Sequence, residues 1–517
     1  MKKKKITVII IVAMLVGSAV GCSALDSTTS EVVVDTDTTE ENTSGINEQV
    51  SSEEEVVVDP TEVISSLAIE EMFTNNELTF IYDTASATSI ALTGESVTID
   101  KEGTYILSGT ISDGQIVVDV EESEKVFLVL DGVDVTSSSS AALYLMEADK
   151  VFVVLAEGST NKLTTTGEFV NEDDTNIDGT IFSKSDISFL GTGSLEIYSE
   201  YGHGIVGKDD VVFIDGTYII SAGSHGINAN DSIRIANADF TIVSGKDGMK
   251  AENEDDYEKG YIYIADGKFN IESEEDAISS SSMIQIDGGE FSIYSGGGFV
   301  EVLNDITVGE GAGNTQKVTD TLENSMKCIK ACNIEINGGD MYISSYEDAL
   351  HADCDMTING GKIHILSGDD AVHAENNLTI NDVELVIEEA YEGIEACYIY
   401  LNGGAIEVNV YDDAINATES YGLLHITGGE IYLSSVGDGL DSNGDLTIEG
   451  GTIVIDCDPI YSGGDGSVDV SGEVTYTGGT IVDADGNEID PTAGLTSGGM
   501  GNFFQMAPSN NRNNARR

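Results

Sequence analysis

A short phrase, usually made of an acid, a small residue and an aliphatic residue, recurs about every 22 residues between residues 203 and 440 of this 517-residue chain. Its aliphatic residue stands at positions 205, 227, 249, 278, 329, 350, 372, 394, 415 and 440. A period of about 20 to 50 residues is the signature of a solenoid, in which each repeat stacks on its neighbours. Equivalent residues then lie above one another, so the recurring acids should form a column of carboxylates.

Each repeat also contains aliphatic residues that alternate with polar ones on both sides of a glycine pair, as in residues 334–343 and 446–455. Alternation with a period of two predicts strands, and glycine supplies the positive φ angles of tight corners. Four Pro and no Trp in the whole chain fit uninterrupted strand ladders. The sequence therefore predicts an all-β solenoid whose coils lie about 4.8 Å apart.

The first 22 residues are typical of a secretory signal with a lipoprotein cleavage site. A basic start (residues 2–5) precedes an apolar run (residues 6–20), and Ala19-Val20-Gly21-Cys22 follows it, as in the bacterial lipobox. The apolar run is short for a membrane-spanning helix. We expect a lipid on Cys22 that holds the protein on the extracytoplasmic face of the cell membrane. A plain signal peptide that happens to contain Cys22 is the alternative.

The rest of the chain divides by composition. Residues 23–62 are rich in Ser, Thr, Asp and Glu and predict a disordered linker. We expect less regular coils in residues 63–198, regular coils in 199–491, a mobile Gly-, Asn- and Arg-rich tail in 492–517, and no second globular domain. The 51-residue gap before position 329 predicts that residues 301–324 leave the solenoid as a loop that overhangs a groove.

Cysteine usage gives a weaker signal. Besides Cys22 the chain has five cysteines, at positions 328, 332, 354, 397 and 457. Their number is odd and none has CxxC spacing, so we expect free thiols or at most one disulfide rather than a metal site.

The charge of the chain constrains its partners. Ninety-three Asp and Glu stand against 22 Lys and Arg, which gives a net charge of −71, so nucleic acid has no basic face to bind. Acids recur on five successive coils, as Asp348, Asp369, Asp370, Glu392, Asp412, Asp413 and Asp438. Carboxylates about 5 Å apart repel one another, and Ca²⁺ bridges such groups with six to eight oxygen ligands. The acids therefore predict a calcium column, with a solvated acidic corner as the alternative.

A second column occupies the position that follows each aliphatic residue. It includes Lys330, His351, His373 and Glu395, which should stack on successive coils and point outward. Three interpretations compete: a polar surface ladder, a row of subsites for a sugar chain, and a catalytic row with Lys330 or Lys250 as the base. Two histidines alone do not make a zinc site, which needs further ligands in tetrahedral geometry.

Several stretches resemble a bacterial carbohydrate-binding parallel β-helix family whose members bind cellulose and polygalacturonate-type sugars. They are residues 108–115, 182–186, 202–210, 245–253, 348–353, 437–444 and 497–500. The resemblance covers residues 68–506 and implies a single-stranded right-handed parallel β-helix, bound calcium and a relationship in fold to pectate lyases. On matched positions it implies that Asp348, Asp370, Asp413 and Asp438 bind calcium. His203, His225 and Lys327 depart from the acid pattern, which puts calcium at those coils in doubt.

Together these features predict a monomeric, lipid-anchored lipoprotein outside the cell that binds polysaccharide, pectin-type or cellulosic, without cleaving it. Calcium would stiffen the acid column and bridge to sugar carboxylates, and Lys330, His351, His373 and Glu395 would contact the sugar. A calcium-dependent polysaccharide lyase with a Lys base and a surface spacer or adhesin without sugar binding are the alternatives.

Overall fold

The computed structural model describes residues 67, 72–81, 85–170, 176–253, 255–256, 258–299, 324–457 and 466–493. The expected signal, Cys22, the linker and the predicted loop at 301–323 lie outside these residues. No helix among the described residues is long and apolar enough to cross a membrane.

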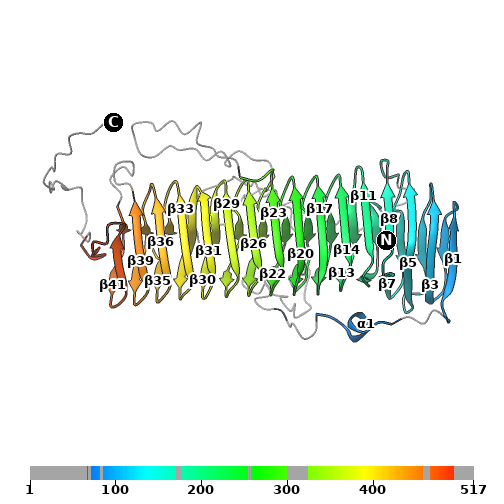
Figure 1. Cartoon of the computed structure of the whole chain (residues 1–517), viewed down its shortest axis with the longest axis horizontal. Helices are drawn as coiled ribbons and strands as arrows, with labels where there is room; N and C mark the ends of the chain where they lie inside the picture. Colours follow the sequence, from blue (N-terminus) through cyan, green and yellow to red (C-terminus); the bar gives the residue numbers. More distant parts are fainter. Residues whose placement is uncertain are drawn as a thin grey trace, which may run out of the picture.

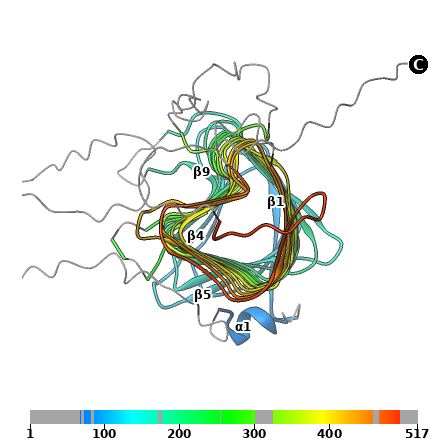
Figure 2. The same cartoon turned by 90° about the vertical axis from the view of Figure 1, so that its left-hand side faces the viewer.

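The chain winds into a long stack of coils that runs from β1 at one end to β42 at the other (Figure 1). Every pairing between named strands is parallel, and partners such as Ile205 and Ile227 lie one repeat apart. Seen along the stack, the coils superimpose on one another around a filled interior (Figure 2). The predicted all-β parallel β-helix is therefore confirmed.

Each regular coil contributes a strand to each of three parallel sheets. The first sheet carries the recurring acid phrase and consists of β2 (Val97–Ile99), β4 (Ile116–Asp119), β6 (Leu143–Glu147), β9 (Gly179–Ser183), β12 (His203–Gly207), β15 (Ile227–Ala229), β18 (Met249–Ala251), β21 (Ile278–Ser280), β24 (Ile329–Ala331), β27 (Leu350–Ala352), the start of β30 (Asp370–Ile380), the start of β32 (Glu392–Leu401), β34 (Ile415–Ala417), β37 (Leu440–Ser442) and β40 (Val468–Val470).

The second sheet follows the first in each coil. It consists of β7 (Lys150–Leu155), β10 (Asp186–Leu190), β13 (Asp210–Phe213), β16 (Ser232–Ile235), β19 (Tyr261–Ile264), β22 (Met283–Ile286), β25 (Asn333–Ile336), β28 (Met356–Ile358), the ends of β30 and β32, β35 (Leu423–Ile426), β38 (Asp445–Ile448) and β41 (Val474–Tyr476).

The third sheet completes the coil. It consists of β8 (Thr160–Thr165), β11 (Ser194–Ser199), β14 (Thr217–Ala222), β17 (Ala238–Ser244), β20 (Gly267–Ser273), β23 (Glu290–Ser295), β26 (Asp340–Ser345), β29 (Lys362–Ser367), β31 (Glu384–Ala390), β33 (Ala405–Val410), β36 (Glu430–Ser435), β39 (Thr452–Cys457) and β42 (Thr480–Asp483). Three strands at the N-terminal end, β1 (Thr88–Thr93), β3 (Gly103–Ile111) and β5 (Lys125–Ser137), lead into the second and third sheets.

The alternation of the sequence sets which side chains are inside. In β33 Ile406, Val408 and Val410 are buried while Glu407 and Asn409 face outward. Such inward residues form one continuous hydrophobic cluster from Leu92 to Ile481. Burial of apolar surface, at about 25 cal/mol per Å², is thus shared by the whole stack, and no coil has a core of its own.

Asparagine hydrogen bonds, a glycine and a disulfide stabilise the corners. At the turn between the second and third sheets, Asn359 donates from Nδ2 to Asn337 Oδ1 at 2.7 Å, and Asn381 donates in the same way to Asn359 at 2.7 Å. Gly361, two residues after Asn359, has a positive φ of +101°, a conformation that a side chain would strain. Cys332 and Cys354, on adjacent coils with Cα atoms 4.8 Å apart, form a disulfide, which agrees with the expectation of at most one.

The segment before β1 lies on the outside of the solenoid and contains the short helix α1 (Asn75–Leu78). Glu77 is 2% exposed and accepts hydrogen bonds at 2.7 Å from Lys150 Nζ and from Ser188 Oγ. Phe80 stacks on Phe127 with ring centroids 4.3 Å apart. Coils were expected in residues 63–198, whereas this segment is a strap that packs on the second sheet.

Candidate functional site

The second predicted column forms an in-register row along the first sheet. Its members pair across successive strands in this order: Val206, Asn228, Lys250, Ser279, Lys330, His351, His373, Glu395, Asn416, Asp441 and Asp469. Most of these side chains are half-buried. Two members of this outward row are buried: Val206 packs in a small apolar cluster, and Ser279 donates to Asp247.

The acids of the other column are more buried than a solvated corner allows. Asp348, Asp370 and Asp438 are 5–6% exposed. One carboxylate oxygen of Asp348 accepts the backbone N–H of Asp370 at 3.2 Å, and one of Asp413 accepts that of Asp438 at 2.6 Å. An unpaired buried N–H destabilises a fold by about 1–3 kcal/mol. The recurring acid therefore has a structural role, because its carboxylate accepts a backbone N–H of the next coil.

The two histidines that replace the acid perform the same function. His203 Nδ1 accepts the N–H of His225 at 3.2 Å, and His225 Nδ1 accepts that of Asp247 at 3.1 Å. Only a neutral imidazole can accept at this nitrogen. Burial, assisted by nearby charges, lowers the pKa of His203 to about 4 and that of His225 to about 3. These coils need an acceptor, and the imidazoles supply it without a charge.

From the coil of Lys327 onward, the protein supplies its own cations to the acids. Lys327 Nζ lies 3.4 Å from carboxylate oxygens of both Glu347 and Asp348, and His351 Nδ1 lies 2.7 Å from Asp348 Oδ2. Burial opposes ionisation here, but Lys327 and His351 hold the pKa of Asp348 well below its usual range. By the same contacts, and again against burial, the pKa values of Lys327 and His351 are raised. Lys327, which replaces the acid in the sequence pattern, is therefore a counter-ion.

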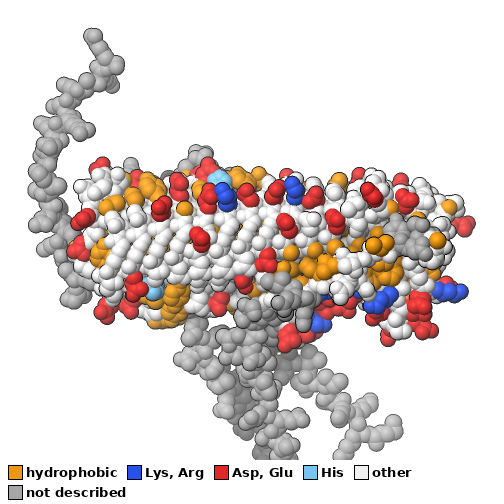
Figure 3. Space-filling model, turned by 60° about the horizontal axis from the view of Figure 1, so that its bottom comes forward, with side chains coloured by type: hydrophobic (Ala, Val, Ile, Leu, Met, Phe, Trp, Pro, Cys, Tyr) orange, Lys and Arg blue, Asp and Glu red, His pale blue; other side chains and the backbone are white. Residues whose placement is uncertain are grey.

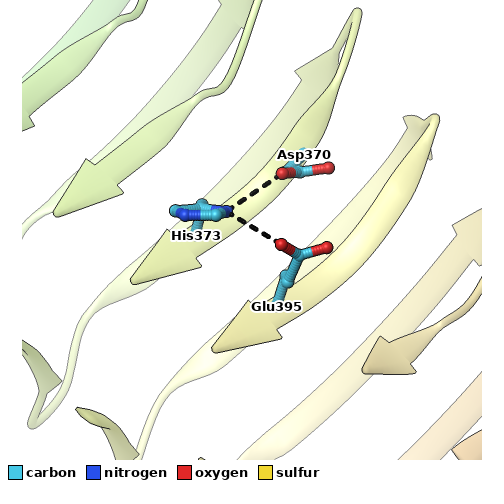
Figure 4. A group of neighbouring side chains, drawn as sticks. All are labelled: Asp370, His373 and Glu395. Atoms are coloured by element: carbon cyan, nitrogen blue, oxygen red, sulfur yellow. Dashed lines mark hydrogen bonds and ion pairs between the residues drawn. The ribbon is translucent and has the colours of Figure 1, made fainter. Parts of the chain in front are cut away.

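His373 holds the last positive charge of this row. Its Nδ1 lies 3.1 Å from Asp370 Oδ2 and 3.4 Å from Glu395 Oε1, so the ring faces both carboxylates (Figure 4). Burial opposes protonation, but the hydrogen bonds to Asp370 and Glu375 raise its pKa well above the ordinary value. An imidazolium has no free lone pair. Asp370, His373 and Glu395 therefore form an ion-pair cluster in this state, although their ligand atoms lie within 4.8 Å of one another.

Past His373 the charge balance changes. The sequence has no Lys or Arg between Lys362 and Arg512. On these coils Asp438, Asp441 and Asp469 bring one carboxylate oxygen each within 4.8 Å of the others. Asn416, which pairs with Asp441, has a buried Oδ1 with no hydrogen-bond partner among the described residues. Carboxylate and amide oxygens are the kind of hard donor that Ca²⁺ takes.

The residues predicted to bind calcium thus separate into two groups. Asp348, Asp369 and Asp370 bring oxygens within 4.8 Å of one another, but two of these acids are already paired with Lys327, His351 and His373. Glu392 pairs in register with Asp370, and Asp412 and Asp413 are half-buried at the following corner. The better candidate for a cation site includes Asp438 and two acids absent from the predicted ligands, Asp441 and Asp469. Their in-register positions in the outward row were the available signal.

The molecular surface shows the same imbalance of charge. On the face drawn in Figure 3, acidic side chains are scattered from end to end and basic ones are few. Hydrophobic side chains gather on the half of this face where α1 and its strap pack on the second sheet. A polyanionic ligand would meet repulsion over most of this surface, so any site for one needs local cations.

Comparison with known proteins gives the family. A carbohydrate-binding domain-containing protein from Acetivibrio thermocellus is 34% identical over 153 residues, which is 29% of this chain and 54% of that protein. The chain therefore spans about half the length of this curated relative. A solved polysaccharide lyase-like protein from C. thermocellum, a gadolinium derivative, aligns with 50% of this chain and 93% of its own at 26% identity, with a TM-score of 0.38.

The family comparison covers most of the solenoid. Residues 93–371 and 369–489 match the model of the family described as carbohydrate-binding domain-containing protein. These ranges include every strand from β2 to β42, and with them both rows of the first sheet. The chain belongs to this carbohydrate-binding domain family.

Proposed function

We propose that this protein binds polysaccharide outside the cell, without cleaving it, along the outward row of the first sheet. The observation that carries the proposal is the change of charge along that row. Lys330, His351 and His373 occupy three successive coils, and three of the next four positions of the row are acids: Glu395, Asp441 and Asp469, with Asn416 after Glu395. Adjacent coils lie about 4.8 Å apart, so a sugar chain aligned with the solenoid meets a different coil at each step.

The cationic half of the row suits the carboxylates of an acidic, pectin-type chain. Lys330 is half-buried and makes no ion pair with a described residue. Its ammonium group carries three donors that a uronate can accept. His351 and His373 are held by acids and would contribute ring surface and local positive charge. This part of the proposal needs no metal ion.

The acidic half would use calcium. Asp438, Asp441 and Asp469 would hold the ion, with Asn416 beside them, and bound Ca²⁺ would neutralise this end and offer open coordination positions to sugar oxygens. Asp348 and Asp370, favoured from the sequence, would contribute less because protein cations already neutralise them. Attachment to a membrane through a lipid on Cys22 is part of the proposal and rests on the lipobox-like sequence alone.

A polysaccharide lyase is the second candidate, because the family resemblance connects the fold with pectate lyases. Such an enzyme needs a basic group that takes a proton from the sugar. Lys250 Nζ pairs with Glu252 at 2.8 Å, which, against the effect of burial, raises the pKa of Lys250 and keeps it protonated. Lys330 is the base that a lyase would use here.

One experiment separates the candidates. The full chain would be run through native gels that contain polygalacturonate, xylan or soluble cellulose derivatives, with Ca²⁺ or EDTA, while ultraviolet absorbance follows unsaturated uronate product in parallel tubes. Retention without product supports binding, and Lys330→Ala should weaken retention on polygalacturonate. Product that grows with time and disappears in Lys330→Ala would make the protein a lyase. A chain that no gel retains would be a surface spacer or adhesin.

A further inference from the structure

A hollow of about 400 Å³ lies where β33, β36 and β39 of the third sheet end. Its polar lining includes Glu389, Asn409, Tyr411, Ser434 and Asp456. Its volume is within the range of about 300–1,000 Å³ that is typical of small-molecule sites. The hollow is on the side of the third sheet, whereas the row proposed for acidic sugars is on the first.

A strand irregularity creates the hollow. The pairing of β31 with β33 shifts register between Ile387 and Ala390, and the pairing of β29 with β31 also shifts. A bulge of this kind turns a side chain away from its regular direction, and here Glu389 joins the lining. On the three coils that follow, the small Ser434 stands in register between Asn409 and Asp456. A large side chain at that position would fill the space.

The lining offers both donors and acceptors around aromatic surface. The hydroxyl of Tyr411 donates to Glu389, and the hydroxyl of Tyr432, a residue that is 39% exposed, lies 3.4 Å from Oδ2 of the lining residue Asp456. The side-chain nitrogen of Asn409 donates to the carbonyl of Glu388 at 2.9 Å. The Oδ1 atom of Asn409 therefore points away from this carbonyl. Carboxylates accept from sugar hydroxyls, and a tyrosine ring packs on the apolar C–H face of a sugar ring.

The charge of the hollow selects among sugars. Glu389 and Asp456 are acids, and the sequence between Lys362 and Arg512 has no Lys or Arg to balance them. A uronate or phosphate placed here would be repelled, by about 1 kcal/mol for each charge at about 4 Å even in water and more where solvent is excluded. A neutral sugar with several hydroxyls avoids this repulsion and uses both acids as acceptors.

We infer that this hollow is a subsite for a neutral sugar residue, separate from the row on the first sheet and independent of calcium. The inference rests on the proposed polysaccharide binding and adds a second class of sugar on a second face. One solenoid would then bind two classes of polysaccharide at two places, acidic chains on the first sheet and neutral chains on the third.

The test uses the full chain with a glucose or xylose hexasaccharide in EDTA, and reads binding by calorimetry. The wild type should bind one of them. Asn409→Ala and Asp456→Ala, both on exposed side chains, should each weaken binding about tenfold through the loss of one hydrogen bond to a hydroxyl. Tyr198→Ala, on another exposed tyrosine of the same sheet, is the matched control and should bind like the wild type.

Cys457 gives a second readout because it lines the hollow and is partly exposed, while Cys328 and Cys397 are buried. The bound hexasaccharide should slow alkylation of Cys457, measured on its peptide by mass spectrometry. Neutral binding that the two variants leave unchanged, or that does not protect Cys457, would overturn the subsite. Absence of neutral binding in a chain that polygalacturonate still retains would overturn it too, and would leave the proposed function standing.

Discussion

The replacement of the recurring acid by His203 can be tested through the pH dependence of the protein's stability. Its side chain is 14% exposed, and its Nδ1 accepts the N–H of His225. The variant His203→Asn keeps an acceptor oxygen at this place but cannot be protonated. His364→Asn, on an imidazole that is 35% exposed on the third sheet, controls for the loss of a histidine outside the ladder.

The direction follows from proton linkage. The pKa of an unfolded histidine is about 6.5, and burial lowers that of folded His203 to about 4. Between these values the unfolded chain binds more protons, so the stabilisation by His203 is complete above about pH 6.5 and is lost as the pH falls toward 4. The two pKa values give a loss of about 2 kcal/mol between pH 7 and pH 5 from this one imidazole.

The assay is urea denaturation of the wild type and both variants at pH 7, 6 and 5. Other groups titrate in this window in all three proteins, so the difference between proteins isolates His203. The wild type and His364→Asn should lose about 2 kcal/mol more than His203→Asn between pH 7 and pH 5. Equal losses in the wild type and His203→Asn would show that the imidazole is not a buried neutral acceptor.

Three further outcomes are expected. The double variant Asp438→Asn, Asp441→Asn should abolish the calcium-dependent rise in melting temperature, which corresponds to about 2.7 kcal/mol at a hundredfold excess of Ca²⁺ over Kd. Asp348→Asn should keep that rise but lower the free energy of unfolding by about 3–5 kcal/mol, because Lys327 and His351 stay buried without their partner. If melting curves with Ca²⁺ and with EDTA show that Asp348→Asn abolishes the rise and the double variant keeps it, the ion binds near Asp348 instead. Lys330→Ala should weaken retention on polygalacturonate and change stability by less than about 0.5 kcal/mol, and a retention equal to wild type in the gels would remove Lys330 from the site. Asn359→Leu should cost about 1–3 kcal/mol for each neighbouring asparagine left unpaired, and an unchanged denaturation midpoint would show that water replaces the ladder.

The repeat predicted the fold because its causes are local. Alternating aliphatic residues and glycine corners decide in each coil which residues are inside. Stacking of the coils then joins these residues into one core. In-register pairing of Lys330, His351 and His373 followed from the period alone. The strap could not be predicted, because Glu77 meets Lys150 73 residues away and no periodicity links them.

The stacking of the two columns was predicted, but the pairing of their charges was not. The sequence places acids at matching positions, but it does not tell that Asp348 lies against Lys327, whose coil follows a 51-residue gap. Nor does it show that an oxygen of Asp348, of Asp413 and of Asp438 accepts a backbone N–H from the next coil. Protein cations and backbone donors therefore use much of the column that calcium was expected to bridge. The same lack of local signal hid the bulge that places Glu389 in the hollow of the third sheet.

The most direct test of polysaccharide binding along the first sheet is the equilibrium binding of an oligogalacturonate to the full chain, measured on one sample with Ca²⁺ and again after EDTA. We expect saturable binding in calcium, weaker binding that still depends on Lys330 in EDTA, and no cleavage of the ligand in either state. A chain that binds no oligogalacturonate in either condition, or that returns it cleaved, would contradict this account.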